Sequence, residues 1–165
     1  MKRKLPARSA AKDDWEEVEI DFTPVEIDLS ISEVREILAA FRLVIDNGVH
    51  VPQWEIICKI GEIKRGIQKF SEDAADFEQS LVSKYADRDE DGNYVKNEDG
   101  NFDLSSPIYS EELRKVQRNQ VKAFIPLWSL GELEWLKGKK VGEHEIAGSV
   151  VTRLFPIIKR KNEAA

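Results

Sequence analysis

Cysteine, histidine and methionine are scarce in this 165-residue chain, which holds one cysteine, two histidines and one methionine. The single cysteine, Cys58, excludes an intramolecular disulfide and indicates a reducing compartment. It lies in an apolar helical pattern without a neighbouring base, so we expect a buried structural thiol and not a nucleophile. His50 and His144 have no metal-ligand spacing with Cys58 or with each other, and both are expected at the surface or in turns.

The chain also lacks common catalytic motifs and long hydrophobic runs. It has no glycine-rich phosphate loop, no Gly-x-Ser-x-Gly turn and no paired cysteines. No apolar run is long enough to span a bilayer, and the basic residues after Met1 are not followed by the apolar stretch of a secretory signal. We therefore predict a non-enzymatic protein without a membrane segment.

Charge is unevenly distributed along the chain. The net charge is −6, yet the first twelve residues carry five positive charges and no negative ones, which leaves −6 − 5 = −11 for the rest. A nucleic-acid-binding body would show a basic face, so contact with DNA or RNA is expected only through the N-terminal residues. Residues 1–15 are predicted to be a disordered basic arm and residues 161–165 a disordered tail. The candidate contact residues of the arm are Lys2, Arg3, Lys4 and Arg8.

Residues 16–160 are predicted to form one domain, which begins with strands and a capped helix. Acidic and apolar residues alternate over residues 17–22 and again over 25–29, which is typical of strands. Ser30 or Ser32 can cap a helix whose apolar residues recur at helical spacing as far as Ile45, and Asn47-Gly48 then ends it.

The strongest pattern is a long helix predicted from Pro52 to about Ala86. Its apolar residues are alternately four and three positions apart, which is a heptad seam of more than three repeats. Gly61 and Gly66 lie off this seam, which indicates either the close approach of another element or tolerated weak points of the helix, and we favour the second. The seam consists of Ile56, Ile60, Ile63, Ile67, Phe70, Ala74, Phe77 and Leu81.

An acidic segment follows the long helix, and its two Asp-Gly pairs predict a β-hairpin tip at residues 88–104. Each pair is followed by Asn and an aromatic residue, Tyr94 or Phe102, and both are candidate interaction residues. A helix that opens at Ser110 is expected to return along the seam as its antiparallel partner. The remaining predicted elements are a strand at 121–127, a short helix at 130–136 and a last helix at 141–159.

Four tryptophans lie at or near the ends of the predicted elements, where an amphipathic ring closes a core or forms a contact patch. We expect core closure for most of them. Trp15 is predicted to be the exposed one and is a further candidate interaction residue, because its neighbours are acidic. The others are Trp54, Trp128 and Trp135.

The acidic segment also matches a calcium-binding EF-hand loop, with acids at positions one, three and five, glycine at six and glutamate at twelve. Asp99-Gly100 follows the last of these positions at once and prevents the outgoing helix of an EF-hand. We therefore prefer a solvated acidic hairpin, keep calcium binding as the alternative and expect no other cofactor. The candidate calcium ligands are Asp87, Asp89, Asp91, Asn93 and Glu98.

Residues 25–158 hold a fixed order of predicted elements. A strand and a helix come first, followed by a long helix that ends in Ser-Lys-Tyr. After it come a D-E-D-G-N-Y-V hairpin, a return helix, a V-K-A-F-I-P-L strand and short helices. This order of elements resembles that of uncharacterised small proteins of tailed phages and prophages. The resemblance implies a phage origin, a non-enzymatic role, and a location in the host cytoplasm or in the virion.

The predicted fold class is α+β and mostly helical. A long antiparallel helical hairpin is tipped by the β-hairpin, and short strands and C-terminal helices form the base. The preferred function is that of a phage accessory or virion-associated protein that binds a viral or host protein. Association with further copies of the same chain is a second possible interaction. The alternatives are a calcium-binding module and an acidic phage inhibitor that occupies a basic cleft of a host factor.

Overall fold

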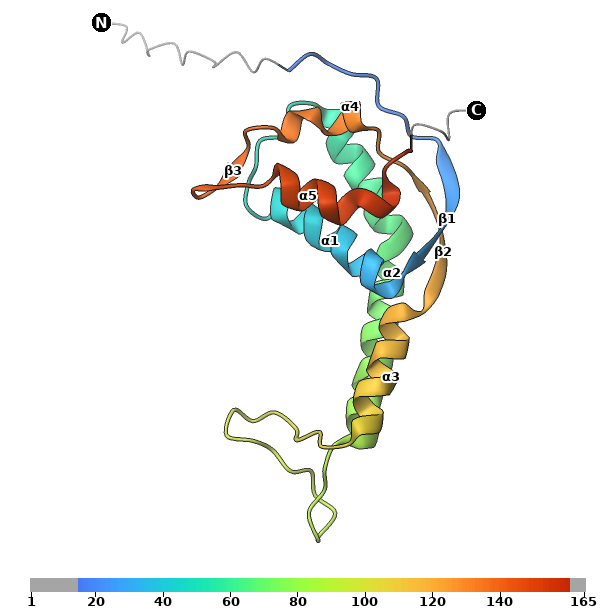
Figure 1. Cartoon of the computed structure of the whole chain (residues 1–165), viewed down its shortest axis with the longest axis vertical. Coiled ribbons are helices and arrows are strands. Elements are labelled where there is room, and N and C mark those ends of the chain that lie inside the picture. Colours follow the sequence, from blue (N-terminus) through green and yellow to red (C-terminus); the bar gives the residue numbers. More distant parts are fainter. Residues whose placement is uncertain (1–14, 161–165) are drawn as a thin grey trace, which may run out of the picture.

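The structure is a computed structural model that describes residues 15–160. A head of helices and two small two-stranded sheets carries a projecting stalk of two helices, and an irregular tip (residues 86–106) closes the far end of the stalk (Figure 1). The predicted α+β, mostly helical class is confirmed. The tail predicted at 161–165 and all of the predicted arm except Trp15 lie outside the described residues.

The chain leaves the head along one helix and returns to it along the next (Figure 1). The helices are α1 (Ile31–Ile45), α2 (Trp54–Tyr85), α3 (Pro107–Arg118), α4 (Leu130–Leu133) and α5 (Ala147–Leu154), with the 3-10 turns η1 (Glu134–Leu136) and η2 (Phe155–Ile157). The strands are β1 (Pro24–Ser30), β2 (Gln120–Pro126), β3 (Lys140–Val141) and β4 (His144–Glu145). Strand β1 pairs antiparallel with β2, and β3 with β4.

Ser30, one of the two predicted capping residues, joins β1 to α1. The Ser30 hydroxyl accepts a 3.1 Å hydrogen bond from the Glu33 N–H, and the Glu33 carboxylate accepts a 3.4 Å bond from the Ser30 N–H. This reciprocal capping box satisfies two N–H groups that the helix itself leaves unpaired. The helix ends at Ile45, shortly before Gly48, whose φ of +63° favours glycine.

The strand predicted at residues 17–22 is wrong, because residues 15–23 form no strand. The side-chain amide of Gln53 takes the place of a neighbouring strand here. It accepts a hydrogen bond from the Val18 N–H at 3.2 Å and donates one to the Val18 carbonyl at 2.8 Å. The backbone of this alternating segment is therefore hydrogen-bonded to a side chain and not to another strand. Sequence periodicity does not distinguish these two kinds of partner.

Helix α2 runs from the head to the far end of the stalk, and in the head it packs against α1 and β2. A Cβ atom placed on Gly66 would lie 2.4 Å from Cγ2 of Ile125 in β2, so this crossing requires glycine. The interpretation of Gly66 as a tolerated weak point is therefore wrong. At Gly61 a Cβ atom would meet only the flexible Arg65 side chain, at 3.5 Å.

These two glycines provide a matched test of the packing between α2 and β2. We expect Gly66→Ala to lower the free energy of unfolding by about 1–3 kcal/mol, because the added methyl group overpacks the contact with Ile125. Gly61→Ala should raise it by about 0.5–1 kcal/mol through helix propensity. Urea unfolding followed by circular dichroism measures both changes, and a stabilised Gly66→Ala variant would contradict the close approach.

The predicted return helix is confirmed, although α3 begins at Pro107, three residues before the predicted opening at Ser110. It runs back along the C-terminal half of α2 and forms the second helix of the stalk (Figure 1). The stalk has a small hydrophobic core separate from that of the head. Its buried residues are Ile31, Ala74, Leu81 and Val116.

The last helix predicted at 141–159 is too long at its beginning. Residues 140–145 form the short hairpin β3–β4, and Gly142 adopts a φ of +62° in its turn. Helix α5 begins only at Ala147 and packs against α1, and η2, which contains Pro156, follows it. Within residues 15–160, no helix combines the length and the apolarity that crossing a membrane requires.

Candidate functional site

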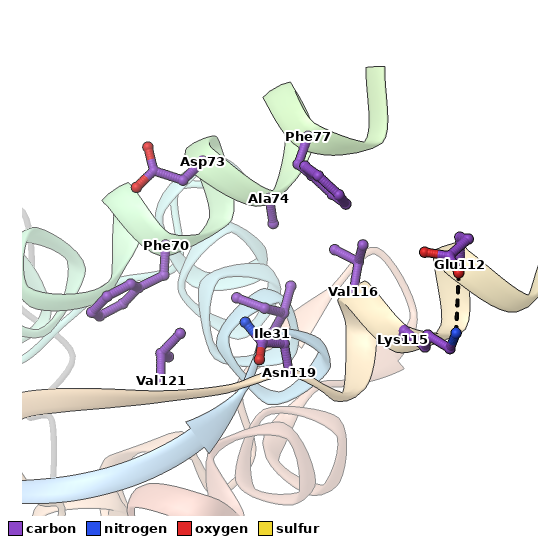
Figure 2. A pocket seen from close by; sticks show the side chains of 10 residues that line it. All are labelled: Ile31, Phe70, Asp73, Ala74, Phe77, Glu112, Lys115, Val116, Asn119 and Val121. Atoms are coloured by element: carbon purple, nitrogen blue, oxygen red, sulfur yellow. Dashed lines mark hydrogen bonds and ion pairs between the residues drawn. The ribbon is translucent and has the colours of Figure 1, made fainter. Parts of the chain in front are cut away.

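A groove opens where the stalk joins the head (Figure 2). One wall belongs to α2 and the other to α3, and residues that begin α1 and β2 close its inner end. Its volume of about 520 Å³ falls within the range of protein ligand cavities. Its apolar lining residues are Phe70, Ala74, Phe77, Val116, Ile31 and Val121.

The groove exists because the heptad seam of α2 is covered unevenly. Ile56, Ile63 and Ile67 are fully buried in the head, whereas Phe77 is 52% exposed although it belongs to the same seam. Ala74 lies between Phe70 and Phe77 on the groove wall and fills little of the space between their rings. A long seam with one open section is typical of a surface that receives another apolar group.

The α2 wall of the groove carries one acidic residue, Asp73. Glu72, Asp76 and Glu78 lie near it in sequence but do not line the groove. Glu78 pairs with Arg35 at 2.7 Å, whereas Asp73 is exposed at the rim and its carboxylate points out of the groove (Figure 2). On the α3 wall, Lys115 lies 3.0 Å from Glu112 and 3.8 Å from Glu111, so acids surround its charge.

The tip consists of two successive turns and not of the single β-hairpin predicted at 88–104. Isolated bridges join Arg88 to Tyr94 and Lys96 to Phe102. In the first turn, the Asp89 carboxylate accepts hydrogen bonds from the N–H groups of Asp91 at 3.0 Å and Asn93 at 2.9 Å. The equivalent Asn97 side chain closes the second turn in the same way. Each turn is therefore closed locally, which prevents one continuous ladder.

Tyr94 and Phe102, the predicted contact residues of the tip, pack against each other with ring centroids 5.0 Å apart. The guanidinium of Arg88 lies 4.5 Å from the Tyr94 ring centroid, and the ammonium of Lys96 lies 5.3 Å from that of Phe102. Both rings thus carry a cation of their own chain on one side. Tyr94 remains 39% exposed.

The five candidate calcium ligands do not form a metal site in the structure. Among residues 15–160, no group of three or more histidine, cysteine, aspartate or glutamate side chains is arranged to hold a metal ion. The Asp89 carboxylate closes its own turn, and the Asp87 carboxylate accepts a 2.7 Å hydrogen bond from the Ser105 hydroxyl. The EF-hand pattern here therefore describes turn chemistry. The other candidates, Asp91, Asn93 and Glu98, belong to the same two turns.

The basic candidate residues Lys2, Arg3, Lys4 and Arg8 lie outside the described residues. Trp15 is half-buried, and its indole N–H points to the side-chain oxygen of Gln53 at 3.4 Å. The expectation that Trp15 is the exposed tryptophan is wrong, since Trp54 is 69% exposed.

The other two tryptophans, Trp128 and Trp135, are buried in the core of the head. Cys58 is half-buried, so its thiol is less enclosed than predicted. His50 and His144 are exposed, as expected.

Comparison with protein-family models, with curated proteins and with solved structures finds no match to this chain. The resemblance to small phage proteins therefore remains a prediction.

A buried ion pair in the head was not predicted. Lys59 of α2 is fully buried, and its ammonium donates to the Glu132 carboxylate at 2.7 Å and to the Leu127 carbonyl at 2.8 Å. The same ammonium lies 4.9 Å from the ring centroid of Trp128. Burial lowers the pKa of Lys59, while the hydrogen bond from its ammonium to Glu132 opposes that shift.

Glu132 of α4 joins its own helix to two other segments of the head, α2 and the residues before β1. Besides Lys59, its carboxylate accepts hydrogen bonds from the Ser129 N–H at 2.6 Å and from the Asp21 N–H at 3.0 Å. The Asp21 carboxylate binds the ammonium of Lys159, and this hydrogen bond lowers the pKa of Asp21 below its ordinary value. The sequence does carry a signal for this site, because Lys59 lies three residues after Ile56 and four before Ile63, on the apolar side of α2. We interpret this cluster of Lys59, Glu132, Asp21 and Lys159 as structural, since its charged groups are hydrogen-bonded to one another and to the backbone.

Proposed function

We propose that this protein is a non-enzymatic phage accessory or virion-associated protein, and that it acts in the host cytoplasm or the virion by binding another protein. The groove between α2 and α3 is its binding surface. The observation that carries the proposal is the open section of the heptad seam, where Phe77 is 52% exposed beside a cavity of about 520 Å³.

The composition of the groove supports a protein ligand. Aromatic side chains at the edge of an apolar cavity are typical of interface residues that contribute much of the binding energy. The rigid helices α2 and α3 hold Phe70, Phe77 and Val116 in place without a partner, which reduces the ordering that binding requires. The element order on which the phage resemblance depends is present in the fold, with two turns in place of the hairpin.

Site-specific photo-crosslinking tests this surface. A photoreactive phenylalanine analogue, benzoylphenylalanine, is placed at Phe77 in the full chain, and cells or particles that contain the protein are irradiated. The matched control carries the analogue at Phe124, which is 68% exposed on β2 but does not line the groove. We expect a covalent adduct with one defined protein from position 77 and none from position 124.

A second variant links the adduct to binding energy. In the complex with the protein identified by the adduct, Phe77→Ala should weaken binding by about 2 kcal/mol, which is about thirtyfold in Kd. Equal adducts from both positions, or an unchanged affinity of Phe77→Ala, would show that the groove is not the binding surface.

A further inference from the structure

We propose that the open side of the stalk is the contact surface of a homodimer, and that the same side of a second copy packs on it in antiparallel orientation. This inference rests on the proposed role of the groove as a binding surface, because the contact covers the mouth of the groove. It commits this surface to one occupant, a second copy of the chain, in the protein without another partner.

Helix α2 carries a second stripe of residues that α3 leaves uncovered. Ala74 and Leu81 of the heptad seam are buried in the stalk core, whereas Phe77 of the same seam is 52% exposed. The stripe shares Phe70 and Phe77 with the seam, and its residues are three and four positions apart, on one side of the helix. This spacing is typical of a helix that packs against a further helix. The open stripe consists of Phe70, Asp73, Phe77, Ser80 and Lys84, of which only Phe70 is half-buried and the others are exposed.

Opposite charges at the two ends of the open stripe select the orientation and the register. Asp73 lies at the head end, on the rim of the groove (Figure 2), and Lys84 at the tip end. Within residues 15–160, neither side chain takes part in an ion pair. Since the midpoint of 73 and 84 lies between positions 78 and 79, a two-fold axis there brings Asp73 of each copy opposite Lys84 of the other. Parallel stripes would instead bring like charges together, which is unfavourable.

The same register matches side chains of different size at the centre of the contact. Phe77 and Ser80 are equally far from the two-fold axis, so the large ring of each copy lies opposite the small side chain of the other. The two rings are then three helical positions apart, about 4.5 Å along the axis, where aromatic side chains can contact each other. The Ser80 hydroxyl donates to the Phe77 carbonyl of its own helix at 2.6 Å, so covering it leaves no unpaired donor.

The size of the stalk indicates a weak dimer. The part of α2 at residues 70–85 is about 24 Å long, and two helices side by side are about 20 Å wide. Pairing two such faces buries about 1,000 Å² in total, which is near the lower limit of specific interfaces, so we expect a Kd of about 10–100 μM. Ile108 of α3 contributes to the face, because it is 53% exposed and lies one turn from Glu112, on the groove side of α3.

The test uses the purified full-length protein alone. Sedimentation equilibrium from about 1 μM to about 500 μM brackets the expected Kd, and we expect a reversible equilibrium between monomer and dimer. Phe77→Asp should weaken the association at least tenfold, because it places a charge against the ring of the second copy. The matched control is Phe124→Asp, at a ring of β2 that is 68% exposed and does not line the groove. It should leave the association unchanged.

Exchange of the two charges tests the orientation. Asp73→Lys and Lys84→Asp each place like charges opposite each other in both halves of the contact, and each should weaken the association about tenfold. The double variant restores both ion pairs with their signs reversed, so its Kd should return to within about threefold of the wild-type value. Both positions are exposed, and circular dichroism verifies that the variants are folded.

A protein that stays monomeric at the highest concentration, or a dimer that Phe77→Asp does not weaken, would overturn the inference. A double variant that associates no better than the single variants would contradict the antiparallel register. An adduct with another protein from position 77 in cells, beside a purified protein that is monomeric, would refute this inference alone. The expected dimer, beside crosslinks in cells only between two copies of the chain, would refute the proposed function alone.

Discussion

Replacing Lys59 by methionine is expected to lower the free energy of unfolding by about 3–5 kcal/mol. The methionine side chain has a similar length and no charge, so the change removes the ammonium while it preserves most of the volume. The Glu132 carboxylate is then left 2% exposed without its cation, in a region where water does not replace the lost hydrogen bond. Equilibrium urea unfolding, followed by circular dichroism, measures the loss.

A double variant separates the ion pair from simple packing. Adding Glu132→Gln to Lys59→Met removes the stranded charge, so the double variant should be more stable than Lys59→Met by about 1–3 kcal/mol. The control is Lys122→Met, which removes an exposed ion pair with Glu26 and should change stability by less than about 1 kcal/mol. A Lys59→Met protein as stable as the wild type would show that the pair contributes nothing to the head.

Ile67→Ala is expected to lower the free energy of unfolding by about 2–5 kcal/mol, because Ile67 is fully buried where the seam of α2 meets the head. Phe77→Ala removes a larger side chain from the same seam, ten residues further along α2. It should cost less than about 1 kcal/mol, since that ring is 52% exposed in the free protein. The same urea unfolding experiment measures both variants.

This contrast tests the central structural claim behind the proposed function. If the seam were covered along its whole length, the two substitutions would destabilise the protein to a similar degree, and the groove would not be open. A small loss for Phe77→Ala also confirms that groove variants remain folded. Their effects on crosslinking can then be attributed to the surface and not to unfolding.

The residues that carry strong local signals were predicted well. Ser30, one of the two predicted capping residues, caps α1 because its hydroxyl needs only the N–H of Glu33, three residues away. The seam of α2 and the antiparallel return of α3 follow from a repeat of apolar residues that has to be buried against something. Strands β1 and β2, predicted at 25–29 and 121–127 from their alternating apolar residues, pair with each other. The cap depends on neighbouring residues, whereas the α2–α3 and β1–β2 contacts join distant segments, each of which carries its own strong local pattern.

The errors share a different cause. In two cases a residue distant in sequence decides the outcome. Residues 17–22 form no strand because the side chain of Gln53 binds their backbone. Gly66 is required because Ile125 of β2 approaches it closely. In the tip, the EF-hand pattern and the hairpin pattern fit the same residues. The Asp89 side chain decides between them by closing its turn on the Asn93 N–H.

The sequence by itself determined the helices of head and stalk, the return of the chain along α2 and the separation of its charge into a basic N-terminal segment and an acidic body. Only the tertiary structure decided that Lys59 is buried against Glu132, 73 residues away, and that the seam is open beside Phe77. The physical reason is that periodicity shows which residues need a neighbour. Whether another segment covers those residues depends on where elements distant in sequence begin and end in space, which only the packed structure determines.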